Sequence, residues 1–552
     1  MTREKFIDMA LGREKAELVI KNAKVVDVFC GRVIDADVAV SDGVIVGIGE
    51  YNGEAEYDAK GQYLMPGFID SHVHIESSMV TPAEYARCVL PRGTTTAVCD
   101  PHEIANVAGL DGILYMMNSA MTSPMDFKFM LSSCVPATDF EDAGATITAK
   151  DTEKFMKKYD FLGLAEMMNY PGLFFKDKEV LAKLDAAEII DGHAPSVCGK
   201  ELMAYAGNGI LTDHECTSAK EMQDKISAGM YALLRCGRMS REFTEMAAAV
   251  DKHTANRVAF CTDDRNLSDI VKSGSVQNCI VTAFGAGMDI FDAIKAATIN
   301  AATCYKLKNL GAVAPGYKAD LVLSKELCPS EILAVWKDGT LVAESGKVNY
   351  EKIPVSKGKG VYNSVNVKKF TEKDLVCEFS KDVPVIGIEA GSLATKIKFA
   401  ENTDGLSHLA VIERHKATGK IGTCYLADYG IKNGAVASCI GHDSHNLIVV
   451  GDNSSDMHLA AESLGKEGGV CVVSGGKVIA KLSLPVAGLM SDLSADEVIK
   501  AHDAVEEAAR ALGTNENIDP IMTLAFLSLP VIPEVRLTAR GLFDGTTFEF
   551  IK

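Results

Sequence analysis

Two patterns of apolar and polar positions follow one another along the chain. Up to about residue 60, short runs rich in β-branched residues are separated by Gly and Asp turns, namely Leu18–Ile20, Lys24–Val28, Ala36–Val40 and Gly43–Gly47. From about Tyr63 to Leu307, apolar runs of strand length alternate with helix-like stretches. The first pattern predicts a small all-β unit, and the second predicts a repeating β/α region.

The repeating region contains about eight apolar runs, each followed by a helical pattern, as expected for a (β/α)₈ barrel. They are Pro66–His74, Thr94–Cys99, Phe127–Cys134, Phe161–Glu166, Glu188–His193, Gly209–His214, Tyr231–Arg235 and Arg257–Asp263. The sequence therefore predicts an α/β barrel whose chemistry lies at the C-terminal ends of its strands.

The β pattern resumes after the barrel. Gly311–Gly316 leads into Ala319–Leu323, and we expect the last strand of this unit to precede the turn at Lys337–Thr340. The prediction is a small split β-sandwich (1–62 with 308–353) into which the barrel (63–307) is inserted. After Pro354 the composition shifts toward Lys, Gly and Ser at 356–360, which indicates a linker into a C-terminal α+β domain (354–552).

Composition narrows the class of protein. The 552 residues are 47% hydrophobic and 24% charged, as in ordinary globular proteins, and the net charge of −19 disfavours a nucleic-acid partner. Met1–Glu17 has no apolar signal region, and no apolar run is long enough to span a bilayer. The 15 cysteines are scattered without a C-x-x-C pair, which indicates reduced thiols. We expect a cytoplasmic protein without a membrane partner.

Polar residues gather where the predicted barrel strands end. His72 and His74 end the first run, and their spacing of two points both imidazoles to one side of a strand. The other residues at strand ends are Glu166, His193, His214 and the pair Asp263-Asp264. Four of the chain's 12 histidines stand at these few positions. Imidazole and carboxylate groups converging on one face predict a site for divalent metal ions.

Some of these residues could instead have a purely structural role. His193 could be a turn residue in Asp191–Pro195, and His214 could neighbour the cap of the next helix. Glu166 is the hardest to account for without a ligand, because a carboxylate that ends an apolar barrel strand needs a charge partner. A pair of divalent cations would supply it.

The motifs that carry a resemblance are the strand Pro66–His74, Thr298–Ala302 and Ala314–Leu321. They resemble the amidohydrolase superfamily over roughly the first two-thirds of the chain. Many superfamily members with two metals bridge them with a carboxylated lysine on the fourth strand, whereas this chain has Glu166 there. That departure weakens a cyclic amidohydrolase assignment, such as hydantoinase or dihydroorotase.

Within the superfamily, the chain is similar over nearly its whole length to the bacterial adenine deaminases. The matching segments are Asp100–Val107, Asp191–Pro195, Thr212–Glu215, Cys261–Arg265 and Leu482–Asp492. The resemblance implies a purine base as substrate, hydrolytic deamination of adenine to hypoxanthine and ammonia, and two divalent ions, Mn²⁺ or Fe²⁺. Zn²⁺ also suits a donor set without thiolate.

Roles for individual residues follow from the chemistry. One metal is expected at His72, His74, Glu166 and Asp263, and the other at Glu166, His193 and His214. A metal pair activates water as a nucleophile, and Asp263 is expected to pass a proton to the departing ammonia, with Asp264 as the alternative. A ring nitrogen also needs a proton, for which the candidates are Glu215 first, then Glu103 and Glu76.

Other polar residues have more than one candidate role. His102 and Glu103 follow the second strand; His102 could be a metal ligand, an outer-shell neighbour of the metal ligands or a satisfied interior histidine. His442 and His445 could reach over the barrel mouth to contact substrate, or form a polar turn that faces water. Arg235 is expected to pair with a nearby acid.

Four rival interpretations compete with this one. They are deamination of an N6-substituted adenine such as 6-methyladenine, a cyclic amidohydrolase, an inactive scaffold and a cytidine-deaminase fold. A scaffold would be expected to lose strand-end ligands, which are all present here. His74-Ile75-Glu76 matches half of the cytidine-deaminase zinc signature, but its Pro-Cys-x-x-Cys partner is absent, so that fold is rejected. Barrels of this type commonly self-associate, and we expect a homo-oligomer, a dimer being the first guess.

Overall fold

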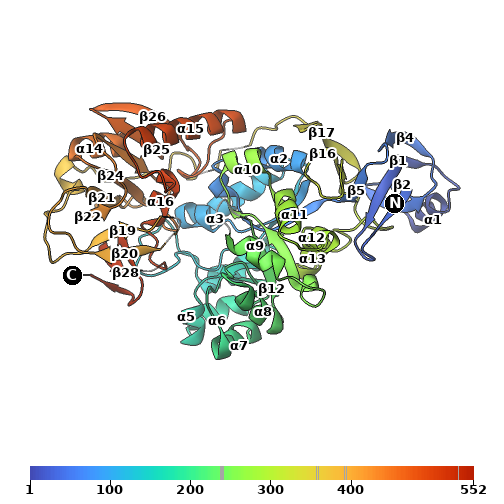
Figure 1. Ribbon diagram of the computed structural model, residues 1–552, viewed down its shortest axis with the longest axis horizontal. Coiled ribbons are helices and arrows are strands. Elements are labelled where there is room, and N and C mark those ends of the chain that lie inside the picture. The colour runs from blue at the N-terminus through green and yellow to red at the C-terminus, as the bar shows by residue number, and fades with distance from the viewer. Residues whose placement is uncertain are drawn as a thin grey trace.

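The computed structural model describes residues 1–552 except 237–240, 356, 359, 391, 393, 533 and 552. The described residues lie in three parts along the long axis of the molecule (Figure 1). A β-sheet built from the N-terminal residues lies at one end, the barrel lies in the centre, and the C-terminal region lies at the other end.

The central part is a TIM-barrel-type arrangement of parallel strands and helices. Its strands are β6 (Phe68–His74), β7 (Thr94–Cys99), β8 (Asp126–Phe129), β9 (Leu164–Met167), β10 (Ile190–Gly192), β11 (Thr212–Asp213), β12 (Tyr231–Arg235) and β13 (Val258–Cys261). Short parallel ladders join β6-β7-β8, β9-β10 and β11-β12-β13. A bridge from Leu131 to Leu164 and the pairing of β14 (Asp263–Asp264) with β6 link these ladders. Each strand lies within or overlaps a predicted run.

Helices follow most of the barrel strands and cover their outer faces. They are α2 (Pro82–Val89), α3 (His102–Ala120), α4 (Ala149–Lys158), α5 (Tyr170–Phe174), α6 (Lys178–Leu184), α7 (Gly199–Gly207), α8 (Ala219–Ser227), α9 (Arg241–Ala248), α10 (Leu267–Ser273), α11 (Val276–Gly285), α12 (Ile290–Ala296) and α13 (Ile299–Cys304). No helix among the described residues is long and apolar enough to cross a membrane.

Strands that precede the barrel in the sequence and strands that follow it form one nine-stranded sheet, whose first strand comes after the helix α1 (Arg3–Ala10). They are β1 (Ala16–Asp27), β2 (Arg32–Ser41), β3 (Val44–Gly49), β4 (Gly53–Asp58), β5 (Tyr63–Pro66), β15 (Leu321–Ser324), β16 (Ile332–Lys337), β17 (Thr340–Glu344) and β18 (Lys347–Val348). Antiparallel pairing of β15 with β5 joins the two sets. The segments before and after the barrel in the sequence therefore share one sheet.

Two details of this sheet differ from the sequence predictions. The runs predicted around Ile20 and Val25 belong to the single strand β1, which continues through a register shift between Ile20 and Ala23. The prediction that the last strand precedes the turn at 337–340 is wrong, because β17 and β18 follow that turn. Their two further antiparallel pairings extend the edge of the sheet.

The C-terminal region is built on an eight-stranded sheet. Its strands are β19 (Val385–Ile388), β20 (Thr395–Lys398), β21 (Ser407–Ile412), β22 (Ile421–Ala427), β23 (Gly434–Ser438), β24 (Leu447–Gly451), β25 (Gly469–Ser474) and β26 (Lys477–Ser483). Its helices are α14 (Ser454–Ser463), α15 (Ala495–Ala511) and α16 (Pro520–Phe526), and a small sheet holds β27 (Val535–Thr538), β28 (Gly541–Asp544) and β29 (Glu549–Phe550). Ser356 and Lys359 of the predicted linker lie outside the described residues.

The C-terminal region contacts the barrel close to the ends of its strands. The Ser491 amide donates to the Met79 carbonyl at 2.8 Å, and the Glu84 carboxylate accepts from the Ala495 amide at 2.9 Å. One continuous apolar core includes residues of both parts, such as Val80 and Leu489. The loop between β23 and β24 thereby comes to lie over the barrel mouth, where it can contribute to a site.

Candidate metal centre and pocket

Strand β6 places two imidazoles side by side at the barrel mouth. The Nε2 atoms of His72 and His74 lie 3.0 Å apart, as the predicted spacing of two on a strand requires. The Asp100 carbonyl lies 3.0 Å from His74 Nδ1 and can accept its proton. Such a bond fixes the ring so that Nε2 points into the centre as a free ligand atom.

Glu166, at the end of β9, lies between four histidines. Its Oε1 is 3.4 Å from His74 Nε2 and 3.2 Å from His102 Nδ1, and its Oε2 is 2.7 Å from His193 Nδ1 and 3.2 Å from His214 Nε2. The side chain is only 3% exposed. Burial by itself would raise the pKa of Glu166, but His193 and the other histidines hold that pKa well below its usual range. An ionised carboxylate thus directs one oxygen to each of two sets of histidines.

Asp263 approaches the same two imidazoles of β6. Its Oδ1 is 3.3 Å from His74 Nε2 and 3.6 Å from His72 Nε2. Its backbone has a φ of 53°, a left-handed conformation that aspartate tolerates better than most residues. Directly before it, Thr262 donates from its hydroxyl and its amide to the buried Asp70 carboxylate, at 2.5 Å and 3.0 Å. This anchor holds Asp263 at the strand end.

His193 and His214 follow β10 and β11, and a buried ion pair fixes the loops that carry them. Lys225 on α8 lies 2.9 Å from Asp213 and donates to the Ala194 carbonyl at 2.8 Å. Asp213 accepts from the amides of Ala194 and Glu215, each at 2.8 Å. The sequence offered no signal for this pair, since it depends on how α8 packs against the strand ends.

Arg235 at the end of β12 joins two acids of the site. Its Nη1 donates to Glu215 at 2.5 Å and to Asp263 at 2.6 Å, and its Nη2 donates to Glu215 at 3.2 Å. The prediction that Arg235 pairs with a nearby acid is confirmed. The planar guanidinium holds the two carboxylates in fixed positions beside the metal centre.

These residues fit divalent metal ions. Ligand atoms lie within 4.8 Å of one another in the groups His72/His74/Asp263, His72/Glu166/His214, His193/His214/Glu215 and His74/Asp100/His102/Glu166. Imidazole nitrogens that face each other at 3.0 Å, as in His72 and His74, need a shared proton or a cation between them. The donor set of nitrogen and carboxylate oxygen suits first-row divalent ions.

All the strand-end residues predicted from the sequence as ligands therefore meet in one centre, which is buried except at the partly exposed His193. The structure adds His102 and Asp100 to this centre, through the contact of His102 with Glu166. Their sequence signal was their place directly after β7, which is again a strand end. Glu215 lies beside the centre, with Oε1 3.7 Å from His214 Nε2.

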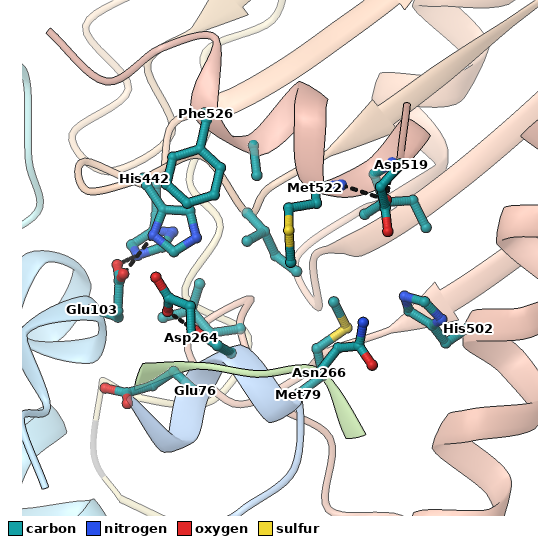
Figure 2. Close-up of a pocket in the computed structure, with 16 residues that line it drawn as sticks. Glu76, Met79, Glu103, Asp264, Asn266, His442, His502, Asp519, Met522 and Phe526 are labelled. Atoms are coloured by element: carbon teal, nitrogen blue, oxygen red, sulfur yellow. Dashed lines mark hydrogen bonds and ion pairs between the residues drawn. The ribbon is translucent and has the colours of Figure 1, made fainter. Parts of the chain in front are cut away.

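A pocket lies outside the metal centre, between the barrel and the C-terminal region (Figure 2). From the barrel it is lined by Glu76, Glu103, Asp264 and Asn266, and from the C-terminal region by residues that include His442, Met522 and Phe526. The rings of His442 and Phe526 stack, with centroids 4.5 Å apart and planes at 12°. Burial raises the pKa of Glu76 to about 7. The pocket thus combines an aromatic wall with buried carboxyl groups, which suits a flat polar ligand.

His442 and His445 do not form a turn facing water, which was one of the two sequence interpretations. They are 7% and 1% exposed, and both contact Glu103 on the first turn of α3. His442 Nδ1 is 2.5 Å from Glu103 Oε1, and His445 Nε2 contacts Glu103 Oε2. The C-terminal region therefore reaches over the barrel mouth, and Glu103 is one of the barrel residues that it contacts there.

Comparison with known proteins agrees with this geometry. The family model described as "Amidohydrolase family" matches residues 63–342, and "Adenine deaminase C-terminal domain" matches residues 390–549. The adenine deaminase of Clostridium acetobutylicum is 45% identical over 99% of each chain. Adenine deaminase 2 of Carboxydothermus hydrogenoformans is 45% identical over 99% of this chain and 98% of its own.

The chain belongs to the adenine deaminase family. The resemblance drawn from the sequence motifs is confirmed, and membership of the amidohydrolases implies dependence on divalent metal. Among solved structures, the L-hydantoinase (dihydropyrimidinase) of Arthrobacter aurescens is 15% identical, with a TM-score of 0.46, over 61% of this chain and 98% of that chain. The two adenine deaminases match the barrel and the C-terminal region together.

Proposed function

We propose that this chain hydrolyses adenine to hypoxanthine and ammonia, a reaction of purine salvage. The observation that carries the proposal is the buried Glu166 among four histidines at the barrel mouth, in a chain that is similar over nearly its full length to adenine deaminases. The pocket beside this centre offers both aromatic and carboxyl groups to a planar base.

Two sets of residues would hold two divalent ions. His72, His74, Glu166 and Asp263 make the first set, and Glu166, His193 and His214 make the second, with Glu166 common to both. Mn²⁺ or Fe²⁺ is our proposal for the metal, and the donor set also suits Zn²⁺. When bound, such ions supply Lewis-acid activation of the water that attacks C6 of adenine.

The chain's own acids account for the protons. Water supplies its oxygen to C6 and releases two protons while the C6–N6 bond breaks. Glu215, held in place by two hydrogen bonds from Arg235, accepts one proton and delivers it to ring nitrogen N1, where it stays in hypoxanthine. Asp263 accepts the other proton and delivers it to N6, which leaves as ammonia. Both carboxylates end as they began.

The remaining residues position the base. We propose that His442, with its ring stacked on Phe526, and His445 contact the substrate, while His102 and Glu103 support the metal centre from outside. We also propose the architecture predicted from the sequence: a split β-sandwich (1–62 with 308–353), a barrel (63–307) and a C-terminal α+β domain (354–552). A cytoplasmic homodimer completes the proposal.

Ammonia release from adenine tests the function. The protein would be purified with manganese supplied and iron sequestered, and its metal content would be counted on the same sample. 6-Methyladenine and dihydroorotate serve as comparison substrates. Turnover of adenine with about two ions in the barrel centre is the expected result. Turnover of the methylated base alone, or of dihydroorotate alone, would contradict the proposal.

A further inference from the structure

A second group of metal-ligating side chains lies outside the barrel centre. It consists of Glu103 on α3 and of His442 and His445 on the loop between β23 and β24. The ligand atoms of the three residues lie within 4.8 Å of one another, and all three side chains are buried. In Figure 2 the imidazole of His442 and the Glu103 carboxylate converge at one wall of the pocket. None of the three belongs to the two sets assigned above to the barrel metals.

The carboxylates around this group have no guanidinium or ammonium partner among the described residues, since the nearby buried Arg414 donates to the carbonyls of His445, Cys439 and Ala487 instead. Among the described residues, Glu103 and Asp443 form ion pairs only with histidines, and neither is paired with a lysine or an arginine. Asp443 lies in the same loop, is 4% exposed, and its Oδ2 has no hydrogen-bond partner. Asp264, also buried, lines the same pocket. Buried carboxylates without a cationic partner are costly, and a bound cation is a common remedy.

The two histidines present nitrogen atoms in a way that suits a cation. His442 directs Nδ1 and His445 directs Nε2 toward the same carboxylate, that of Glu103. A single imidazolium ion would be enough to neutralise this carboxylate. His445 Nδ1 has no partner, so no hydrogen bond from that atom fixes the tautomer. Neutral imidazoles could then offer both facing nitrogens as ligands.

We propose that Glu103, His442 and His445 bind a third divalent transition-metal ion, which fastens the C-terminal region to the barrel. Two imidazoles and one carboxylate form a three-ligand set that leaves a position open, as in many non-structural zinc, iron and manganese sites. Asp443 lies next to this set: its Oδ1 is 3.8 Å from His102 Nε2, and Glu103 Oε1 is 3.5 Å from the same atom. The proposal rests on ligand geometry and does not depend on the substrate proposed above.

The site would act as a clamp because its ligands come from distant parts of the chain. Glu103 and His442 are 339 positions apart in sequence. An ion held by both would fix the loop 439–446 over the pocket, and with it the ring of His442 that faces Phe526. His442 Nε2 is not used in the contact with Glu103, so a substrate contact at that atom is compatible with the clamp.

Metal counting on the full chain tests the proposal. The protein would be loaded with Mn²⁺, desalted, and analysed for manganese per chain. We expect about three ions in the unaltered protein, two of them at the barrel centre. Both the double variant His442→Ala/His445→Ala and the isosteric variant Glu103→Gln should lose one ion. His458→Ala, which removes a histidine of the same region on α14 away from the pocket, should lose none.

Hydrogen exchange gives a second measurement that does not depend on activity. Peptides covering residues 439–446 and the first turn of α3 should become protected when Mn²⁺ is added to the metal-free protein. This protection should be absent from Glu103→Gln. Two ions per chain in the unaltered protein, or an unchanged count in Glu103→Gln, would overturn the proposal. Ammonia release from adenine, measured on the same sample, separates a failure of this site from a failure of the proposed function.

Discussion

Asp263 and Asp264 are neighbours with the same functional group but different surroundings. One oxygen of Asp263 lies 3.3 Å from His74, and the other accepts a hydrogen bond from Arg235 at 2.6 Å. Asp264 instead accepts a hydrogen bond from Ser77 and lines the outer pocket. The sequence left both as candidates for proton transfer, and only their side-chain directions distinguish them.

We expect Asp263→Asn to lower kcat by about 10²–10⁴-fold, because an amide can neither accept the proton of water nor serve as an ionised ligand. Asp264→Asn should act mainly on KM, since that side chain faces the pocket. Ammonia release at several adenine concentrations, with manganese counted for each variant, would check this. A larger loss of kcat in Asp264→Asn would reassign the proton transfer to Asp264.

Glu215 and Glu76 can be compared in the same way. Arg235 donates two hydrogen bonds to Glu215, whereas Glu76 is buried with one oxygen that has no partner. We expect Glu215→Gln to lower kcat by about 10²–10⁴-fold and Glu76→Gln to lower it by less than tenfold, because the proposed route of the N1 proton passes only through Glu215. The reverse order in a steady-state assay would move this role to Glu76.

At the scale of elements, the packing of α8 against the strand ends holds two ligand loops in place. Lys225 is fully buried and contacts Asp213 and the Ala194 carbonyl, between His193 and His214. Lys225→Met should lower the free energy of unfolding by about 3–5 kcal/mol, because Asp213 is left as a buried charge without its partner. It should also weaken manganese retention. Urea unfolding and metal counting would measure the two effects.

Lys220→Met is the matched control for this prediction. Lys220 lies on the same helix but is 81% exposed and pairs with Asp224 at the surface. Its loss should leave the free energy of unfolding nearly unchanged, because solvent screens an exposed ion pair. Equal effects of the two variants would show that the buried pair does not hold the loops.

A second ion cluster joins the barrel to the nine-stranded sheet. Lys337 at the end of β16 is buried and lies 3.0 Å from Asp320 and 3.2 Å from Asp126 of β8. Burial alone would raise the pKa of Asp126, but Lys337 and two further lysines lower it to about 2. The stabilisation from Asp126 is therefore present above pH 4 and is lost as the pH falls toward 2.

We expect Lys337→Met to be less stable than the unaltered protein at neutral pH, with a difference that narrows as the pH falls below 4. The contribution of Asp126 to this difference is at most about 2 kcal/mol, because Lys128 and Lys318 also lower its pKa. Urea unfolding at a series of pH values would measure it. Lys325→Met, which removes an exposed partner of Glu331 in the same sheet, should show no such dependence. A gap that stays constant with pH would contradict the assignment to Asp126.

At the scale of the whole molecule, the C-terminal region completes both the core and the pocket. Apolar residues of the barrel and of this region belong to one core, and α16 supplies Met522 and Phe526 to the pocket. The strand-like contact of Val80 with Ser491 lies between the two parts. The barrel is therefore not expected to work alone, although it holds every ligand of the proposed metal pair.

A chain that ends at residue 353 should accumulate in insoluble form, because it exposes apolar surface that the C-terminal region covers. Any soluble fraction should show a large loss of kcat/KM for adenine, since the wall made by His442 and Phe526 is missing. Solubility after expression and ammonia release would be measured. A soluble truncated chain with full activity would mean that the C-terminal region is dispensable for the reaction.

Much of the fold was predictable from local patterns. The alternation of apolar runs with helical stretches predicted the barrel strands, and the residues at their ends predicted the metal centre. Strand bounds differed by a few residues, and the strands after the turn at 337–340 were missed because they lie beyond the predicted edge of the sheet. The motifs also predicted the family, which the comparisons confirm.

The sequence by itself determined which residues end the barrel strands. The alternation of side chains along a strand and the length of an apolar run are local properties of the chain. Only the tertiary structure decided which acid faces which base. Three of these contacts depend on how separate elements pack. Arg235 joins Glu215 to Asp263, Lys225 lies between two ligand loops, and Glu103 meets His442, which is 339 positions away in sequence. Contacts of that kind are fixed by the folded core, and no local pattern of the sequence encodes them.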